Sequence, residues 1–275
     1  VAPSDLSLQM IGYRPRRRAV VKVACGDEVV YVKVLRARLF DDVLARHRLL
    51  ADAGLPVAQV AATTDDHLLV LRELPGRPLA RAIFDAAEPC SAEALIELLD
   101  AMPVSVALLD RRPPWSDAVS HYARMVAAAM PALQSRLDWL VDTIGQGLAG
   151  IPTGNEPTHG DFHEGQVHVG GGRVCGLLDT DTIGPGRRAD DLACLVAHLS
   201  TIQRMNATQE ARVHSLIRRW VPVFDTRVDA TELRLRSAAV IISLATGPFR
   251  GQEPDWERET AMMIGSAEAL VRQVS

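Results

Sequence analysis

The sequence is short of lysine and of long apolar runs, and it has no surplus of positive charge. None of its 275 residues belongs to a run of about 18 consecutive apolar residues, the length that a membrane-spanning helix needs. Acidic residues outnumber basic ones, 34 to 30, for a net charge of −4. Because proteins bind phosphate backbones through a basic surplus, this balance argues against a general nucleic-acid binder. We therefore expect no membrane span and no nucleic-acid partner.

Cysteine pairs and a secretory signal are also missing. The four cysteines, Cys25, Cys90, Cys175 and Cys194, are widely spaced and form no C-x-x-C pair, which predicts free thiols in a reducing cytoplasm. The first residues lack the basic and then apolar pattern of a signal peptide. The chain begins with Val1 and not with methionine, so we expect the natural start to lie upstream. Its length and its 48% hydrophobic residues indicate a globular protein with one large domain or two small ones.

Lysine occurs only twice. Of the 30 basic residues 28 are arginine, a bias that a GC-rich genome would explain, and only Lys22 and Lys33 are lysine. Arginine cannot replace a compact ammonium charge on a flexible stem, so a lysine retained in such a chain can mark a functional site. The alternative is that both lysines are chance survivors of the bias.

Residues 1–74 are predicted to form a small antiparallel sheet with one helix. The strands are short runs rich in valine and other apolar residues, separated by turns such as Gly26-Asp27. A helix with one apolar side is expected from Leu39 to about Ala53, with Gly54 as its end. The expected strands are Leu6–Ile11, Ala19–Ala24, Val29–Leu35 and His67–Leu71.

A break in regular structure at Leu74–Pro78 separates this part from residues 75–275, which are predicted to be mainly helical. Two short strands, Gln166–Val169 and Arg173–Leu178, flank three glycines and predict a hairpin. The expected helical segments run from Ser91 towards Asp110 with a kink near Pro103, from Trp115 to Ile144 with a break at Pro131, and onwards from Asp190.

Acidic and imidazole side chains gather between apolar strands in the segment 158–181. One interpretation is a phosphoryl-transfer site, which needs a carboxylate to orient and deprotonate an acceptor hydroxyl, and oxygen ligands for Mg²⁺ on the nucleotide phosphates. Asp161 would be the base, while Gln166, five residues on, and Asp179, thirteen further, would hold the metal. The first interval matches the D-x-x-x-x-N spacing of kinase catalytic loops. Lys33, on a predicted strand upstream, would then grip the phosphates.

Two other interpretations stay open. His159, Asp161 and His163 alternate along the chain and would share one face of an extended segment, where they could hold Zn²⁺ or Mn²⁺ in a metal-dependent phosphohydrolase. Asp179 and Asp181 could complete a dinuclear site. Alternatively, these side chains only satisfy buried backbone groups, as buried polar groups must. The whole cluster, together with a lone strand lysine, is improbable as chance.

The motif H-G-D-F-H-E-G-Q at residues 159–166 resembles H-G-D-x-H-x-x-N, the catalytic motif of the aminoglycoside-phosphotransferase-like kinases. This family shares the protein-kinase fold and phosphorylates small molecules. Asp179 is similar to the family's later metal-binding aspartate, and Asp191-Leu192-Ala193 to the D-L-A that braces the catalytic loop. The Gly-Gln ending of the motif and the tail from Gly247 to Trp256 resemble the maltokinase-like branch and related actinobacterial phosphotransferases. The resemblance covers nearly the whole chain.

This resemblance implies a bilobal α+β protein-kinase-like fold, with a nucleotide-binding N-lobe of residues 1–74 and a helical C-lobe of residues 75–275. It implies ATP and Mg²⁺ as cofactors and a small-molecule hydroxyl acceptor, with Asp161 as the catalytic base. The expected contacts are Lys33 on the phosphates, Glu73 and Leu74 near the adenine, His159 and His163 in the catalytic loop, and Gln166, Asp179 and Asp181 around Mg²⁺.

Two features depart from the family pattern. No G-x-G loop lies between the first two strands, where Arg14 to Arg18 stand instead and either touch phosphates or are merely solvated. The helix after Lys33 offers no glutamate to pair with it. At about 100° per residue, Asp42 lies at the edge of the apolar face and Asp41 nearly opposite, so Asp42 is the predicted substitute partner. These gaps leave open a kinase-like nucleotide-binding module without catalysis.

The sequence does not identify the acceptor, which could be a sugar, an amino sugar or an amino alcohol. Acidic residues such as Asp110 and Glu164 permit a cationic aminoglycoside, and aromatic residues permit a neutral sugar that stacks on them. His198 and Trp220 are expected in the core. The aromatic residues that could line an acceptor pocket, or only pack, are Trp115, Tyr122, Phe249 and Trp256.

Overall fold

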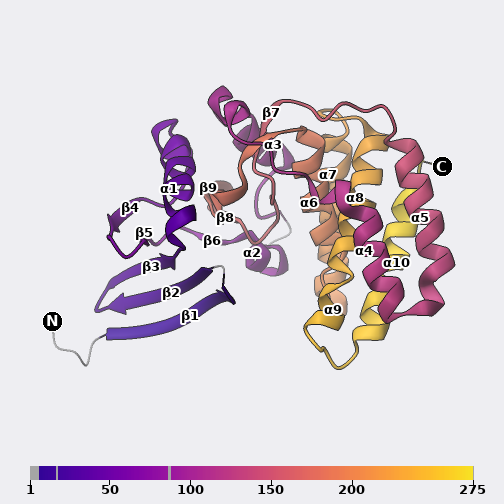
Figure 1. Cartoon of the computed structure of the whole chain (residues 1–275), viewed down its shortest axis with the longest axis horizontal. Coiled ribbons are helices and arrows are strands. Elements are labelled where there is room, and N and C mark those ends of the chain that lie inside the picture. The colour runs from indigo at the N-terminus through magenta and orange to yellow at the C-terminus, as the bar shows by residue number, and fades with distance from the viewer. Residues whose placement is uncertain (1–5, 17, 86–87, 275) are drawn as a thin grey trace.

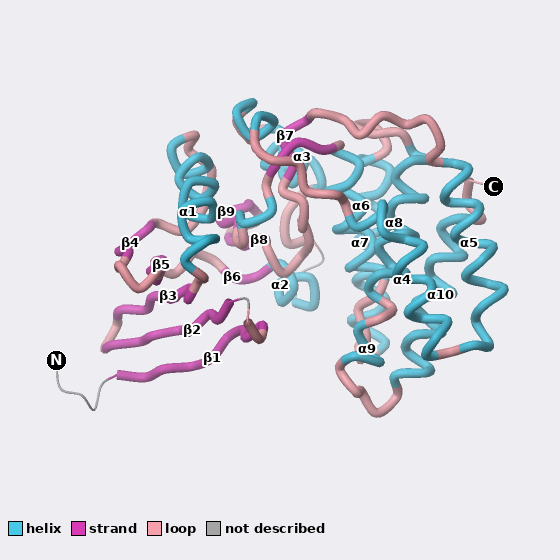
Figure 2. Tube along the Cα trace, in the orientation of Figure 1, coloured by secondary structure: helices cyan, strands magenta, loops and turns pink. Residues whose placement is uncertain are grey.

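The computed structural model describes residues 6–16, 18–85 and 88–274. Strands gather towards the N-terminal side and helices form the rest (Figure 1, Figure 2). The first lobe contains a five-stranded antiparallel sheet in the order β1-β2-β3-β5-β4. Its strands are β1 (Leu6–Arg14), β2 (Arg18–Cys25), β3 (Glu28–Val34), β4 (Val60–Thr63) and β5 (Leu68–Arg72). All but β4 were expected, because valine-rich runs such as those of β2 and β3 favour a pleated surface.

Helix α1 (Ala37–Asp52) lies against this sheet (Figure 1). Its buried Phe40, Val43 and Leu44 belong to one hydrophobic cluster with Leu69 and Leu71 of β5. Lys33 on β3 is paired in register with Leu69, and only 9% of it is exposed. The first lobe therefore holds a buried lysine beside its own small core.

The second lobe is mainly helical, as the sequence predicts. Ser91 caps α3 by accepting a hydrogen bond from the backbone N–H of Ala94, and Pro131 separates α4 from α5. Helix α8 is buried along most of its length and packs on α4, α5, α6 and α10. The helices are α2 (Leu79–Asp85), α3 (Ala92–Asp100), α4 (Val119–Ala129), α5 (Gln134–Gly147), α6 (Arg188–Ser200), α7 (Ala207–Phe224), α8 (Ala230–Leu244), α9 (Gly247–Arg250) and α10 (Trp256–Val271). Shorter 3₁₀ turns are η2 (Val104–Leu108), η3 (Trp115–Ala118), η4 (Pro131–Leu133) and η5 (Thr180–Thr182).

Short strands between the lobes position the polar segments that the sequence singles out. The predicted hairpin is present, and it turns at Gly171 and Gly172, whose φ angles of +58° and +75° favour glycine. Residues 159–166 connect β7 to β8, and residues 178–181 follow β9. These strands are β6 (Arg77–Pro78), β8 (Val167–Gly170) and β9 (Arg173–Leu177) in one sheet, and β7 (Glu156–Thr158) with β10 (Gly184–Gly186) in another.

The cysteines and the absence of long apolar runs led to two expectations that can be compared with this fold. The four cysteines are all free thiols, as their spacing predicts. Across the residues that the structure describes, no helix combines the length and the apolar character that a membrane crossing requires.

Candidate active site

The loop 159–166 is fixed at its start by helix α6. The buried Asp191 carboxylate accepts hydrogen bonds from the backbone N–H groups of His159 and Gly160, at 2.9 and 2.8 Å. Gly160 has a φ of +81°, and a Cβ there would lie 2.6 Å from the carbonyl oxygen of Thr182, so the position requires glycine. The predicted brace from the D-L-A segment is therefore present.

Asp161 follows this anchored pair and is half-buried. Its backbone N–H donates to Nδ1 of His159 at 3.3 Å, and the Nε2 of the same imidazole lies 2.9 Å from the carbonyl oxygen of Leu178. His159 is thus a buried tie between the loop and the segment after β9. Among the described residues no hydrogen bond reaches the Asp161 carboxylate, which leaves its oxygens free for a ligand.

Asp179 and Asp181 meet two cations from the first lobe. The Lys33 ammonium lies 3.1 Å from Oδ1 of Asp179 and 2.9 Å from Oδ1 of Asp181. The Arg18 guanidinium donates to both oxygens of Asp179 and to Oδ2 of Asp181, each at 2.7 Å. The structure therefore brings together Lys33, Asp179 and Asp181, which the sequence had assigned to one site.

Opposite charges keep Asp179 and Lys33 ionised. Burial alone would raise the pKa of Asp179, but Lys33 and Arg18 hold it well below its usual range. Burial likewise works to lower the pKa of Lys33, yet attraction to Asp179 and Asp181 raises it overall. Two carboxylates on one turn are the oxygen ligands that Mg²⁺ prefers, so the donor set at Asp179 and Asp181 fits that ion.

Asp42 does not take the place predicted for it. Its carboxylate accepts hydrogen bonds from Arg46 at 2.9 Å and from Arg112 at 3.1 Å, while Lys33 pairs with the aspartates after β9. Arg46 lies four residues further on the same helix, an interval at which side chains of a helix meet. Because the sequence argument placed Asp42 only by its angle on α1, it overlooked this nearer partner.

Arg18 was not singled out for this position by the sequence argument. Strand side chains alternate between faces, so Arg18 and Val20 of β2 share one face. Val20 is paired in register with Lys33 of β3, and all three residues line one pocket. Knowledge of the pairing register would therefore have placed Arg18 beside Lys33. Arg17, in the same predicted turn, lies outside the described residues.

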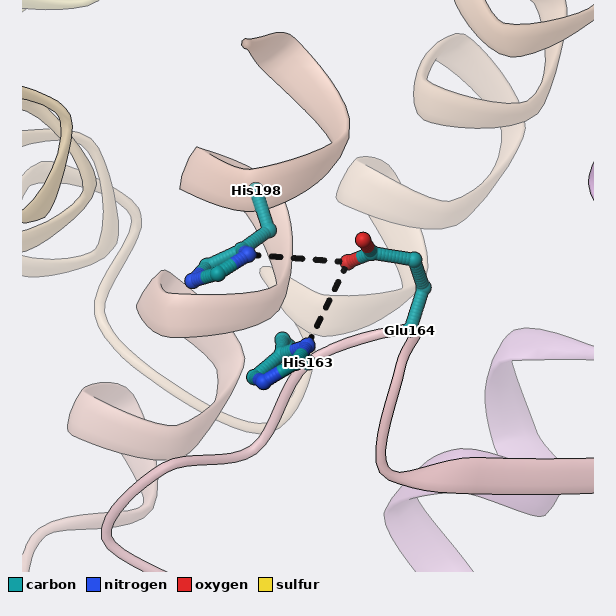
Figure 3. Close-up of side chains that lie close together, drawn as sticks. All are labelled: His163, Glu164 and His198. Carbon is teal, nitrogen blue, oxygen red and sulfur yellow. Dashed lines mark ion pairs between the residues drawn. The ribbon is translucent and has the colours of Figure 1, made fainter. Parts of the chain in front are cut away.

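His163, Glu164 and His198 form a second polar cluster at the far end of the loop (Figure 3). The two imidazole rings stack at 4.2 Å with planes 6° apart, and their Nδ1 atoms lie 3.8 and 3.9 Å from Oε2 of Glu164. That carboxylate oxygen is buried without a hydrogen-bond partner within the described part of the chain. His198, which was expected in the core, is thus half-buried beside the loop 159–166, whereas Trp220 is buried as expected.

The metal-hydrolase arrangement does not form. In the described chain only His163, Glu164 and His198 bring three possible ligand atoms within 4.8 Å of one another, and neither His159 nor Asp161 belongs to that group. A metal ion lies in the plane of an imidazole that binds it, because the nitrogen lone pair points there. One ion cannot lie in the planes of two parallel stacked rings, so this cluster also lacks the geometry of a metal centre.

Two pockets adjoin these residues. The interlobe pocket, of about 510 Å³, is lined by Lys33, Glu73, Leu74, Gln166 and Asp179 among others. The Asp161 pocket, of about 250 Å³, lies next to Asp161 and His163. Its lining residues are Arg14, Trp115, Tyr122, Asp161, His163, His198, Val240, Ser243, Leu244, Thr246, Gly247 and Arg250.

Gln166 and Glu73 hold different positions in the interlobe pocket. The side-chain Nε2 of Gln166 lies 3.1 Å from Nε2 of His163, and its backbone oxygen accepts a hydrogen bond from the N–H of Leu178. The Glu73 carboxylate accepts hydrogen bonds from Lys22 and Tyr31, and Glu73 and Leu74 both line the pocket.

The four aromatic residues considered for an acceptor pocket divide into two pairs. Trp115 and Tyr122 line the Asp161 pocket, and their ring centroids lie 6.2 Å apart. Phe249 and Trp256 pack on each other with ring centroids 5.3 Å apart, and neither lines that pocket.

The loop 159–166, the Asp191 carboxylate that fixes it, and the paired Asp179 and Asp181 form one candidate site. The chain that carries this site can be compared with known families. The model of the phosphotransferase enzyme family matches residues 11–224, which is most of the chain. The chain belongs to this family. No curated protein sequence matches the phosphotransferase significantly.

Solved structures show the fold that this phosphotransferase shares. It aligns with a thermostable mutant of aminoglycoside phosphotransferase APH(4)-Ia, in a ternary complex with ADP and hygromycin B, at 14% identity and a TM-score of 0.69, covering 98% of this chain and 94% of that one. A choline/ethanolamine kinase family protein from Mesorhizobium loti gives 16% identity and a TM-score of 0.63, with coverages of 96% and 87%.

A third structure is spectinomycin phosphotransferase APH(9)-Ia in complex with ADP and spectinomycin. It gives 13% identity and a TM-score of 0.62, with coverages of 96% of this chain and 92% of that one. At these identities the likenesses establish the fold, which is the predicted bilobal protein-kinase-like arrangement of a strand-rich lobe and a helical lobe.

Glu164 makes the stability of the phosphotransferase depend on pH. Burial raises the pKa of Glu164 from 4.5 to about 7, so the folded protein binds an extra proton between these two values. This extra proton stabilises the folded protein relative to the ionised form of Glu164. The stabilisation is fully present below pH 4.5 and is lost as the pH rises through about 7. Glu164→Gln is neutral at every pH and is expected to match wild type near pH 5. At pH 8 we expect it to be more stable than wild type by about 2–3 kcal/mol.

Thermal unfolding of both proteins at pH 5 and pH 8 measures this difference. Glu97→Gln, at an exposed position on α3, is the matched control and should show no gain at either pH. An equal gain of Glu164→Gln at both pH values would contradict the assignment, because packing and not ionisation would then be its source.

Proposed function

We propose that the protein transfers the γ-phosphoryl group of ATP to a hydroxyl of a small molecule. The single observation that carries this proposal is that a free Asp161 carboxylate lines one pocket while Lys33 and Asp179 line the interlobe pocket. A phosphoryl transfer needs these two halves, because the acceptor must be oriented while the charge of the triphosphate is neutralised.

Each half of the site has its own residues. Lys33 and Arg18 bind phosphate oxygens of the nucleotide, since both cations line the interlobe pocket. Asp179, Asp181 and Gln166 offer oxygens to Mg²⁺, which when bound would offset the negative charge of the phosphates. Asp161 accepts the proton of the acceptor hydroxyl.

The remaining assignments follow from this division. Residues 1–74 form the nucleotide-binding lobe, and residues 75–275 contribute the catalytic loop and the acceptor site. The backbone of Glu73 and Leu74 contacts the base of the nucleotide. His159 and His163 support the loop 159–166. Four free cysteines support a cytoplasmic location. Membership of the maltokinase-like branch stays a prediction.

A nucleotide-binding module without catalysis is the second candidate. It is favoured by the sequence, which has Arg14 to Arg18 where the family carries its glycine loop, and by the ion pairs that Arg18 makes with both aspartates. A bound nucleotide with Mg²⁺ must displace these ion pairs, and an inactive protein could retain them permanently.

One experiment separates these possibilities. We expect ATP with Mg²⁺ to raise the melting temperature, because a ligand at about 100 times its Kd stabilises a protein by about 2.7 kcal/mol. A panel of hydroxyl acceptors should then stimulate ADP release. Nucleotide binding without any stimulated release would favour the inactive module. No shift with ATP or GTP, together with stoichiometric zinc in the purified protein, would overturn the proposal in favour of a hydrolase.

A further inference from the structure

The Asp161 pocket is bordered by two arginines from opposite ends of the chain. Arg14 is the last residue of β1, and Arg250 is the last residue of α9, and both line this pocket. Asp161 is the one carboxylate among the lining residues of the described pocket. Two guanidinium groups therefore face the space in which an acceptor hydroxyl would approach Asp161.

Neither arginine is engaged elsewhere in the described chain. Most arginines near the site hold a carboxylate, as Arg18 holds Asp179 and Arg204 holds Glu253. Within residues 6–16, 18–85 and 88–274, Arg14 and Arg250 have neither an ion pair nor a hydrogen bond from their side chains, and both are exposed. Their charges are thus available to a ligand without first breaking a bond.

The nearby acidic groups do not offset these charges. Glu164 is buried behind His163 and His198, and its side chain is absent from the pocket lining. Glu253 is bound to Arg204. A polycationic amino sugar would thus meet two like charges and one carboxylate, whereas an anion would meet two planar guanidinium forks that match a carboxylate or a phosphate.

The size of the pocket also restricts the acceptor. A volume of about 250 Å³ lies below the ~300–1,000 Å³ of pockets for drug-sized ligands. Trp115 is 41% exposed on its wall, and with Tyr122 it offers an aromatic surface on which a single ring can lie. The pocket therefore fits a compound of about one ring better than an antibiotic of several rings.

We propose that the acceptor is a small anionic hydroxyl compound, with a carboxylate or phosphate group held by Arg14 and Arg250 and a hydroxyl directed to Asp161. This inference rests on the proposed function, and it specifies the chemical class of acceptor at the same site. The specificity of the enzyme then comes from these two arginines, the positive rim of the pocket, which disfavour cationic substrates as well as favouring anionic ones.

Four sugars with one framework test this inference: glucose, glucuronate, glucose 6-phosphate and glucosamine. Binding of each to the protein with ADP and Mg²⁺ is measured by calorimetry, and acceptor-stimulated ADP release is measured with ATP. We expect at least one anionic sugar to bind about tenfold or more tightly than glucose, and glucosamine to bind more weakly than glucose. The comparison of glucuronate with glucose 6-phosphate shows which anion the rim prefers.

The arginine variants locate the effect. Arg14→Ala and Arg250→Ala should each weaken binding of the preferred anion by about tenfold to a hundredfold, the loss typical of a hydrogen bond to a charged group. Binding of glucose should change less than threefold. Arg124→Ala, at an exposed position on α4 outside the pocket, is the matched control and should change neither.

The outcomes separate this inference from the proposed function. Turnover with glucosamine above that with the anions would overturn the anionic acceptor while confirming a phosphotransferase. Anion binding that depends on both arginines, without any ADP release, would support the pocket assignment and contradict the catalytic proposal. Failure of both anions to bind would overturn the inference. It would also be overturned if Arg14→Ala and Arg250→Ala raised the KM for ATP and left the KM for the acceptor unchanged.

Discussion

Replacing Asp161 with asparagine is expected to lower turnover of any accepted substrate by about 10²–10⁴-fold, the contribution of a well-placed general base. Asparagine keeps the shape of the side chain and removes its capacity to take a proton. The loop should keep its conformation, because Asp161 is held through its backbone N–H and not through its carboxylate. Steady-state kinetics with the best acceptor of the panel measures the loss in kcat.

Nucleotide affinity separates this effect from a damaged fold. Asp161 lines the Asp161 pocket and is absent from the lining of the interlobe pocket, so ATP should bind to the variant almost as tightly as to wild type. Asp66→Asn, in the exposed turn between β4 and β5, is the matched control and should keep full activity. If Asp161→Asn retained turnover within about threefold of wild type, far less than a base contributes, its assigned role would be wrong.

Local patterns in the sequence were sufficient to predict most of the helices and strands. Valine-rich runs predicted β2 and β3, the apolar side of residues 39–53 predicted α1, and Ser91 and Pro131 marked helix boundaries that the structure contains. These signals act within a few residues of the chain, which is why they can be found without tertiary contacts. The four residues of β4 were missed, because so short an exposed strand has little apolar alternation.

The motif singled out the loop 159–166 as a candidate site, but the surroundings of this loop depend on contacts between distant segments. The pairing of Arg18 with Asp179 joins residues 161 positions apart, and the stacking of His163 on His198 joins a loop to helix α6. No period within one strand or helix contains such contacts. The error at Asp42 is only partly of this kind. Arg112 comes from the other lobe, but Arg46 lies four residues further along α1 and is a local partner that the sequence argument overlooked.

Replacing Lys33 with alanine is expected to weaken binding of ATP with Mg²⁺ by about 30-fold or more. Truncating one partner of a buried charge pair costs about 2–5 kcal/mol, and each 1.4 kcal/mol is a factor of ten in affinity. Lys33 is 9% exposed and makes two of the ion pairs around Asp179 and Asp181, so solvent cannot replace it. Calorimetric titration with a non-hydrolysable ATP analogue measures the loss.

The second lysine provides the matched control. Lys22 is on β2, next to the strand that carries Lys33, but it pairs with the exposed Glu73 carboxylate. Because surface ion pairs contribute little, Lys22→Ala should bind the analogue within about threefold of wild type. Lys33→Ala should still fold, because Arg18 continues to neutralise both aspartates. If Lys33→Ala melted near the wild-type temperature and bound the nucleotide normally, Arg18 alone would hold the phosphates, and the conclusion that the retained lysine marks the site would be wrong.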